Sequence, residues 1–245
     1  MQTTLRTLSK RITTTTLRSF QTSTTSLNSS SCCPSCSNPL GSSNTSPLCP
    51  SCKSLVPPPP SSITHFNLLS QTQTQGGSGE SFPKYSIDLK QLKKQFLNLQ
   101  QKVHPDRYSE AGNGNGNGNE KENWAKLWSS RVNQAWKTLS NDRERAEYLL
   151  SLYDVTIGES DPVTDPELLM SIMETRELLE EAKTLDQVEQ IRSQNSQQTR
   201  EAIELLKKAF DETFPPDLEL ARNLVIQLKY LDNVETVCRE WNGPK

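Results

Sequence analysis

Long apolar runs are missing from this 245-residue chain, and only 32% of its residues are hydrophobic. Without a run of about 18–20 apolar residues the sequence predicts no membrane-spanning helix, and we expect a soluble protein. Regular alternation of apolar and polar residues is also missing, so no strands of useful length are expected and the folded part is predicted to be all-α. The net charge of −2 gives no general attraction to nucleic acid or to anionic membranes.

Acidic residues are absent from the beginning of the chain, where the first is Glu80. The first 30 residues instead combine Arg6, Lys10, Arg11 and Arg18 with many Ser and Thr and a few spaced apolar residues. This pattern, which has no continuous apolar segment of a secretory signal, is typical of an organelle transit peptide. We therefore predict that residues 1–30 are a disordered mitochondrial transit peptide and that the mature protein lies in the matrix. A disordered Ser/Thr tail and a plastid leader are the alternatives that composition leaves open.

Cysteine is concentrated in one short segment, residues 31–56, which holds five of the six cysteines. Cys33-Pro-Ser-Cys36 and Cys49-Pro-Ser-Cys52 are two CxxC motifs separated by 12 residues. Two residues between sulfurs let one turn present both thiolates to one ion, and two such turns complete a tetrahedron. The segment is therefore predicted to bind a structural zinc ion, with Cys32 as a spare neighbouring thiol.

Three other readings of these cysteines remain. A dithiol redox site normally lies at a helix start in a βαβ unit, which is not expected here. Disulfides would suit an oxidising compartment rather than a matrix. A nucleic-acid-binding zinc ribbon would need surrounding basic residues, and only Lys53 is close in sequence. Cys238 lies in a helical pattern and is predicted to be a buried small apolar residue.

Helical periodicity begins after the proline-rich linker 57–62, and a domain is expected over residues 63–153. Asp88 can cap a helix that runs to Val103, and one face of that helix is basic, with Lys90, Lys93 and Lys94. The apolar stripe on its other side contains Leu89, Leu92, Phe96, Leu99 and Val103. A second amphipathic helix follows the glycine- and asparagine-rich residues 112–119, and its apolar positions are Trp124, Leu127, Trp128, Val132, Ala135, Trp136 and Leu139.

His104-Pro105-Asp106 ends the first of these helices, because proline cannot donate to the helical ladder. A simple cap and turn is one interpretation of the tripeptide. A metal-binding or nucleophilic histidine has no support, since His65 is the only other histidine. The glycine-rich repeat does not form a phosphate-binding loop either, because it lacks the lysine and the preceding strand of that motif.

The C-terminal residues 166–245, beyond a linker at 154–165, are expected to form a three-helix bundle. Asp165-Pro166-Glu167 fits the start of its first helix, Thr184 with Gln187 a capping box for the second, and Asp217 the start of the third. The positions predicted to face the bundle core in the first helix are Leu168, Ile172, Thr175, Leu178, Leu179 and Ala182. In the third helix they are Leu220, Leu224, Leu228, Leu231 and Val234. Leu169, Met170 and Met173 are left on a different face of the first helix, and an exposed apolar cluster of this kind suggests an interface.

The basic helix, the HPD turn and the second helix together resemble the J-domain of DnaJ-type co-chaperones. The stretches NQAWKTL at 133–139 and RAEYLL at 145–150 narrow the resemblance to the HscB branch, and a tetracysteine segment before a proline-rich linker is similar to its eukaryotic members. The resemblance covers roughly residues 33–230, and the polar insertions at 71–79 and 112–119 depart from it. Arg107 stands where many J-domains have lysine and keeps the charge.

What the resemblance implies is a co-chaperone in iron–sulfur cluster biogenesis that is not itself an enzyme. A mitochondrial heat-shock-70-class chaperone would bind the HPD turn and the basic face and would respond with faster ATP hydrolysis. Its contact residues would be His104, Pro105, Asp106, Lys90, Lys93, Lys94 and Arg107. An IscU-type cluster scaffold would bind the bundle through Leu169, Met170, Met173, Glu174, Arg176, Glu177 and Tyr230.

Two other classes of function compete with this hypothesis. A zinc-dependent nucleic-acid or RNA-processing factor predicts salt-sensitive polynucleotide binding, and the acidic pI of about 5.8 argues against it. A thiol oxidoreductase would be excluded by a tightly bound zinc ion that resists mild oxidants. Neither nucleic acid nor a membrane is an expected partner.

Overall fold

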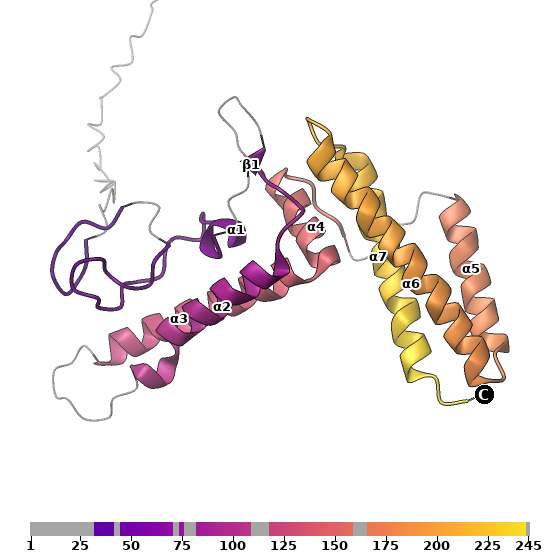
Figure 1. The fold of residues 1–245 in the computed structure, drawn as a ribbon, viewed down its shortest axis with the longest axis horizontal. Helices are drawn as coiled ribbons and strands as arrows, with labels where there is room; N and C mark the ends of the chain where they lie inside the picture. The colour runs from indigo at the N-terminus through magenta and orange to yellow at the C-terminus, as the bar shows by residue number, and fades with distance from the viewer. Residues whose placement is uncertain are drawn as a thin grey trace, which may run out of the picture.

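The computed structural model describes residues 32–41, 45–70, 74–75, 82–108, 118–158 and 166–243. These residues form a helical protein, as predicted, in which one end of a helical hairpin points toward the side of a three-helix bundle (Figure 1). Outside the helices, β1 (Thr74–Gln75) pairs with β2 (Phe82–Pro83) in a two-residue antiparallel pairing, and two isolated β-bridges, Cys32 with Pro39 and Leu48 with Leu55, lie in the tetracysteine segment. The expected transit peptide, most of the 112–119 repeat and Asp165 lie outside the described residues. None of the described helices has the length and apolar character that crossing a membrane requires.

The hairpin consists of α2 (Leu89–Val103) and α3 (Gly118–Ser140). α2 begins where the sequence predicts, because the Asp88 carboxylate accepts hydrogen bonds from the backbone N–H groups of Lys90 and Gln91. Its C-terminal residue is followed by His104 and a single 3₁₀ turn, η1 (Pro105–Arg107). The hairpin core is formed by residues that the apolar stripes predict, among them Leu92, Val103, Trp128, Val132, Ala135 and Leu139.

Leu89 and Leu127 depart from the predicted stripes, since 46% and 53% of their surfaces are exposed. Leu89 and Leu127 lie on the predicted apolar stripes of their helices. In the folded hairpin, however, the partner helix does not cover these two positions.

Two further helices close the hairpin. α1 (His65–Leu68) is capped by the Thr64 hydroxyl and buries Phe66 and Leu68, and α4 (Asp142–Leu152) follows α3 after Asn141, whose side chain caps it. The ring of Tyr85 is buried between Arg145 of α4 and Phe210, and its hydroxyl donates to the carbonyl of Asp142.

The bundle contains α5 (Pro166–Glu181), α6 (Leu185–Lys207) and α7 (Leu218–Glu240), and α6 continues into one π-helical turn, η2 (Lys208–Glu212). The predicted capping box is present: the Thr184 hydroxyl accepts from the N–H of Gln187, and the Gln187 side chain accepts from the N–H of Thr184. Asp217 caps α7 in the same manner, through the N–H of Leu220.

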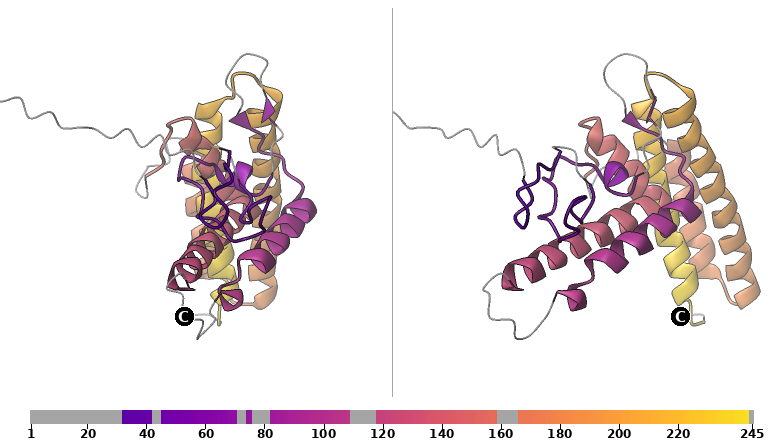
Figure 2. Two further views of the ribbon diagram at one scale, coloured as in Figure 1. Left: turned by 90° about the vertical axis from the view of Figure 1, so that its left-hand side faces the viewer. Right: turned by 60° about the vertical axis from the view of Figure 1, so that its left-hand side comes forward.

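α7 packs on two sides, against α6 within the bundle and against α4 of the hairpin (Figure 2). For this reason its buried set is wider than the single predicted stripe and includes Ala221 and Val225, which belong to the core shared with the hairpin. One hydrophobic core therefore runs from the hairpin through α4 into the bundle. The ion pair between Arg143 on α4 and Asp232 on α7, at 2.7 Å, lies on the surface of this contact.

Two predicted bundle-core positions are wrong. Leu178 on α5 and Leu220 on α7 are 53% and 40% exposed. Leu178 lies at the outer edge of the predicted arc, and α5 contacts its neighbours over a strip too narrow to cover that edge. Leu220 lies in the first turn of α7, at the open end of the bundle.

Candidate functional site

The four predicted metal ligands are carried by two backbone turns of the same design. In each turn the first cysteine's carbonyl accepts from a residue with positive φ four positions on, Ser37 (57°) or Lys53 (58°). The first cysteine's N–H donates to the carbonyl of Asn38 or Ser54, at 2.8 and 2.9 Å. Each turn thereby places both of its sulfurs on the same side, where they face the sulfurs of the other turn.

The two turns bring the four sulfurs together, as the sequence predicts. All four Sγ atoms of Cys33, Cys36, Cys49 and Cys52 lie within 4.8 Å of one another, with 3.6 Å between Cys33 and Cys52 and 3.7 Å between Cys36 and Cys49. A tetrahedral ion with metal–sulfur bonds of ~2.3 Å requires sulfur–sulfur separations of about 3.8 Å. The cluster therefore has the size and the thiolate donors for one tetrahedral metal ion. Cys32 is exposed and is not part of this group.

The thiols of the cluster differ in acidity because they share one small space. The N–H and hydroxyl of Ser54 lower the pKa of Cys52 to about 6. For Cys36, the N–H of Asn38 acts to lower the pKa, but the neighbouring Cys52, burial and the other two sulfurs together raise it to about 12. Ionising one sulfur thus opposes ionisation of the next, and a cation at the centre removes that conflict.

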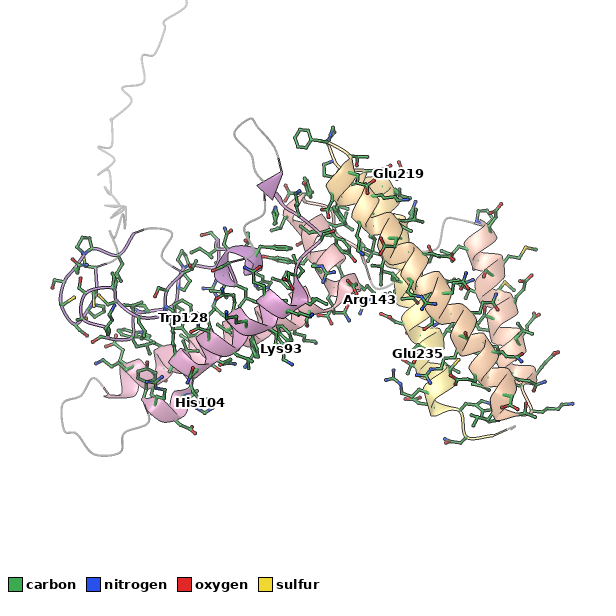
Figure 3. The ribbon with its side chains drawn as sticks, viewed as in Figure 1. Lys93, His104, Trp128, Arg143, Glu219 and Glu235 are labelled. Carbon is green, nitrogen blue, oxygen red and sulfur yellow. The ribbon has the colours of Figure 1, made fainter. Side chains whose placement is uncertain are left out.

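The tetracysteine segment is not a free appendage, because it packs against α3. Leu55 is buried in the hairpin core, and the indole N–H of Trp128 donates to the carbonyl of Val56 at 2.8 Å. The guanidinium of Arg131 donates to the carbonyls of Pro59 and Pro60, so the proline-rich stretch lies along the same helix. Figure 3 shows Trp128 on the side of α3 that meets this segment. Sequence periodicity places Trp128 in a core but cannot indicate that the cysteine segment covers it.

The HPD turn lies at the free end of the hairpin, away from the bundle (Figure 3). Its side chains point outward: the side chains of His104 and Asp106 are 56% and 86% exposed, and the His104 Nδ1 lies 3.6 Å from the Asp106 Oδ2. The Asp106 N–H donates to that same nitrogen at 3.3 Å. Arg107 donates to the carbonyl of Gln101 at 2.8 Å, which ties the turn to the last residues of α2. The turn is therefore exposed at the end of α2 and is tied to that helix by the hydrogen bond of Arg107.

The basic face predicted on α2 continues from this turn. Lys90, Lys93 and Lys94 are all exposed, and none of the ion pairs found among the described residues involves them. Three free ammonium groups on one helix face make a surface that attracts an acidic partner and accelerates its approach.

The second exposed face lies on α5, at the opposite end of the molecule. The side chains of Leu169, Met170 and Met173 are 47%, 67% and 55% exposed, as expected for residues left out of the bundle core. Glu174, Arg176 and Glu177 are exposed beside them. Tyr230 on α7 is partly buried and lines both hollows that separate α5 from α7. The structure thus brings the seven predicted scaffold-binding residues to one region of the bundle.

Sequence reasoning missed one residue of this region. Asn195 on α6 is 5% exposed in the middle of the bundle, which is unusual for an amide. The only available signal was a polar residue at a position where the helical period requires an apolar one.

Comparison with known proteins identifies relatives of this chain. Residues 164–238 match the sequence model of the HSCB C-terminal oligomerisation domain. The chain is 33% identical over 128 residues to an iron–sulfur cluster co-chaperone protein HscB homolog of Arabidopsis thaliana, which covers 52% of this chain and 48% of the relative. It is 31% identical over 155 residues to a co-chaperone protein HscB homolog of Burkholderia vietnamiensis, covering 62% of this chain and 83% of the relative.

The fold is similar to that of human co-chaperone protein HscB, with a TM-score of 0.72 and 26% sequence identity over 85% of this chain and 97% of the human chain. The chain spans about half the length of the Arabidopsis relative, whereas it spans most of the bacterial relative and of the human structure. The matches include both the hairpin and the bundle. On these grounds the chain belongs to the HscB family of iron–sulfur cluster co-chaperones.

Proposed function

We propose that this protein binds an IscU-type iron–sulfur scaffold, delivers it to a heat-shock-70-class chaperone of the mitochondrial matrix, and stimulates the ATPase of that chaperone. The observation that carries the proposal is the exposed HPD turn at the end of a basic helix, in a chain that belongs to the HscB family. The HPD turn and the exposed face of α5 lie at opposite ends of the molecule (Figure 1), so one molecule can hold two partners at once.

The catalytic chemistry belongs to the partner in this proposal. The lysines of α2 and Arg107 steer an acidic surface of the chaperone toward the turn. His104, Pro105 and Asp106 then make the specific contacts, and the exposed Asp106 carboxylate provides acceptors for a charged donor of the chaperone. At the other end, burial of Leu169, Met170 and Met173 supplies the free energy of scaffold binding, while Glu174, Arg176 and Glu177 provide a polar rim.

The tetracysteine cluster completes the proposal as a structural zinc site. Four thiolates at tetrahedral spacing fit zinc and leave no open position for water, so the metal would hold the two turns together without taking part in a reaction. Its effect on function would be indirect, through the contacts of Leu55 and Val56 with the hairpin.

The decisive experiment measures ATP hydrolysis by the chaperone in the presence of the scaffold and of each variant. His104→Gln is expected to abolish the stimulation because it removes the imidazole of the exposed turn without affecting any buried group. Lys93→Gln should weaken it and make it less sensitive to salt, whereas Lys126→Gln, which removes an exposed lysine from α3, should leave it unchanged. Full stimulation by the His104→Gln variant would refute the proposal.

A further inference from the structure

The larger of the two hollows beside Tyr230 is a groove between α5 and α7. It has a volume of about 820 Å³ and continues from Tyr230 toward the C-terminal ends of both helices, near the C mark of Figure 1. The wall that α7 contributes advances from Tyr230 to Glu240, which is about 15 Å at ~1.5 Å per residue. The groove is therefore long enough for about ten residues of helix or about four to five residues of extended chain.

The floor of this groove is apolar. Its apolar lining consists of Ile172, Leu179, Ala182, Val234, Val237 and Trp241. Several of these side chains belong to a small hydrophobic cluster at this end of the bundle, and Trp241 packs against that cluster. Val237 differs from its buried neighbours because 50% of its surface is exposed. An aliphatic side chain held open to water beside an apolar floor gains free energy when a partner covers it.

The groove is continuous with the exposed face of α5. At 100° per residue, Leu169, Met173, Arg176 and Glu180 fall within about 60° of one another on the helical wheel. Arg176 and Glu180 line the groove, whereas Leu169 and Met173 are exposed one and two turns earlier on the same stripe. A partner that covers Leu169 and Met173 therefore meets the groove on the same side of α5, and Tyr230 marks where the groove begins on α7.

The charged residues around the groove are mostly acidic. Glu180 and Glu240 line it, and Arg176 is the basic residue of its lining. Glu174 and Glu177 are exposed on the neighbouring face of α5. Four carboxylates and one guanidinium favour a partner segment that has basic residues beside its apolar side chains.

We infer that this groove binds an apolar segment of the scaffold that carries basic residues at its edges, and that Val237 and Trp241 are contact residues of that interface. The inference rests on the proposed function, because the scaffold is the partner proposed for the adjoining face of α5. It extends the interface beyond the seven residues that the family resemblance implies, along the last turns of α7. A groove of fixed length also adds selectivity, because a partner without a matching segment leaves it unfilled.

The first test compares Val237→Asp with the wild-type chain in scaffold binding by titration calorimetry. Docking would bury the new carboxylate against an apolar floor, so we expect the Kd to rise about tenfold or more. Leu178→Asp is the matched control, because Leu178 is 53% exposed but lies on the opposite side of α5 from Leu169, and it should bind within about twofold of the wild type. Urea unfolding of the same samples checks that both variants are folded. Wild-type affinity of Val237→Asp, or an equal loss in Leu178→Asp, would overturn the inference.

The second test uses the wild-type chain and separates this inference from the proposed function. Intermolecular NOEs are measured from the protonated scaffold to the methyl groups of a deuterated, methyl-labelled chain. We expect NOEs at Leu169 and Val237 and none at Leu178. NOEs at Leu169 without any at Val237 would overturn the inference and leave the proposed function intact, whereas NOEs at neither residue would reject scaffold binding at this face altogether. A shift of the Val237 signals when the chain alone is concentrated would assign the groove to a second copy of the chain and would also overturn the inference.

Discussion

The apolar face of α5 allows a quantitative prediction, because its three large side chains are exposed by known amounts. Leu169, Met170 and Met173 are 47%, 67% and 55% exposed, and the variant replaces all three with alanine. Full burial of one such side chain stabilises by ~1.5–3 kcal/mol. Because each side chain is already about half buried, docking can gain only about half of this burial free energy. Alanine also keeps the Cβ atom, so each substitution should cost ~1 kcal/mol of binding free energy.

The sum of about 3 kcal/mol corresponds to roughly a hundredfold increase in the Kd for the scaffold. The stability of the folded chain should change little, since exposed substitutions usually stay within ~0.5 kcal/mol and alanine favours the helix. Titration calorimetry gives the Kd, and urea unfolding of the same samples gives the stability.

Leu178→Ala provides the matched control for this prediction. Leu178 lies on the same helix and is 53% exposed, yet on the helical wheel it is well separated from Leu169 and Met173. It should bind the scaffold within about twofold of the wild type. The reasoning is refuted if the triple variant also binds within twofold, or if Leu178→Ala weakens binding as much as the triple variant does.

Three further predictions concern the metal content and the stability of the chain. Cys49→Ser should lower the metal content, measured by mass spectrometry of the native protein, from one zinc ion per chain to well below one, because one of four ligands is lost. Trp128→Phe should destabilise the chain by roughly 1–3 kcal/mol in urea unfolding, since the buried carbonyl of Val56 loses its donor. Burial, and then the charge of Arg131, lower the pKa of His65 from its ordinary value of 6.5, so the neutral form is favoured in the folded chain. Its contribution to stability is complete above pH 6.5 and is lost as the pH falls from 6.5 through the lower folded pKa, which urea unfolding midpoints across that range will show.

Each of these predictions has its own control. Cys238→Ser changes a buried thiol outside the cluster and should leave the metal content at one ion per chain. Trp241→Phe alters a partly buried indole in the C-terminal segment and should cost less than Trp128→Phe. His65→Phe keeps an aromatic ring against Tyr148 and should flatten the pH dependence between pH 6.5 and the lower folded pKa. A variant that retains the full slope would show that another group titrates.

Local chemistry made much of this protein predictable. Helix starts depend on side chains adjacent in sequence, so Asp88, Thr184 and Asp217 could be identified as caps without the fold. Paired CxxC motifs fix the sulfurs of each turn in the same local way. The exposure of the HPD turn follows from a proline that ends a helix where its polar neighbours must remain in water.

Other features depended on which surfaces meet across the chain. Leu178 and Leu220 share the periodicity of core residues but lie where no partner helix reaches, whereas Val225 is buried because α4 covers a second side of α7. Periodicity reports that a helix has an apolar face, and it does not report how wide a strip the neighbouring helices will cover.

The sequence by itself determined the helical class, the helix starts, the two CxxC turns and the two faces left over from the core, because each follows from neighbours within a few residues along the chain. Only the tertiary structure decided that the tetracysteine segment packs on Trp128 and that Asn195 lines a cavity beside Tyr230. Trp128 lies 72 positions from its hydrogen-bond partner Val56, and Asn195 lies 36 positions from its partner Leu231. Their formation depends on how helices of given lengths pack around one shared core, which no local pattern encodes.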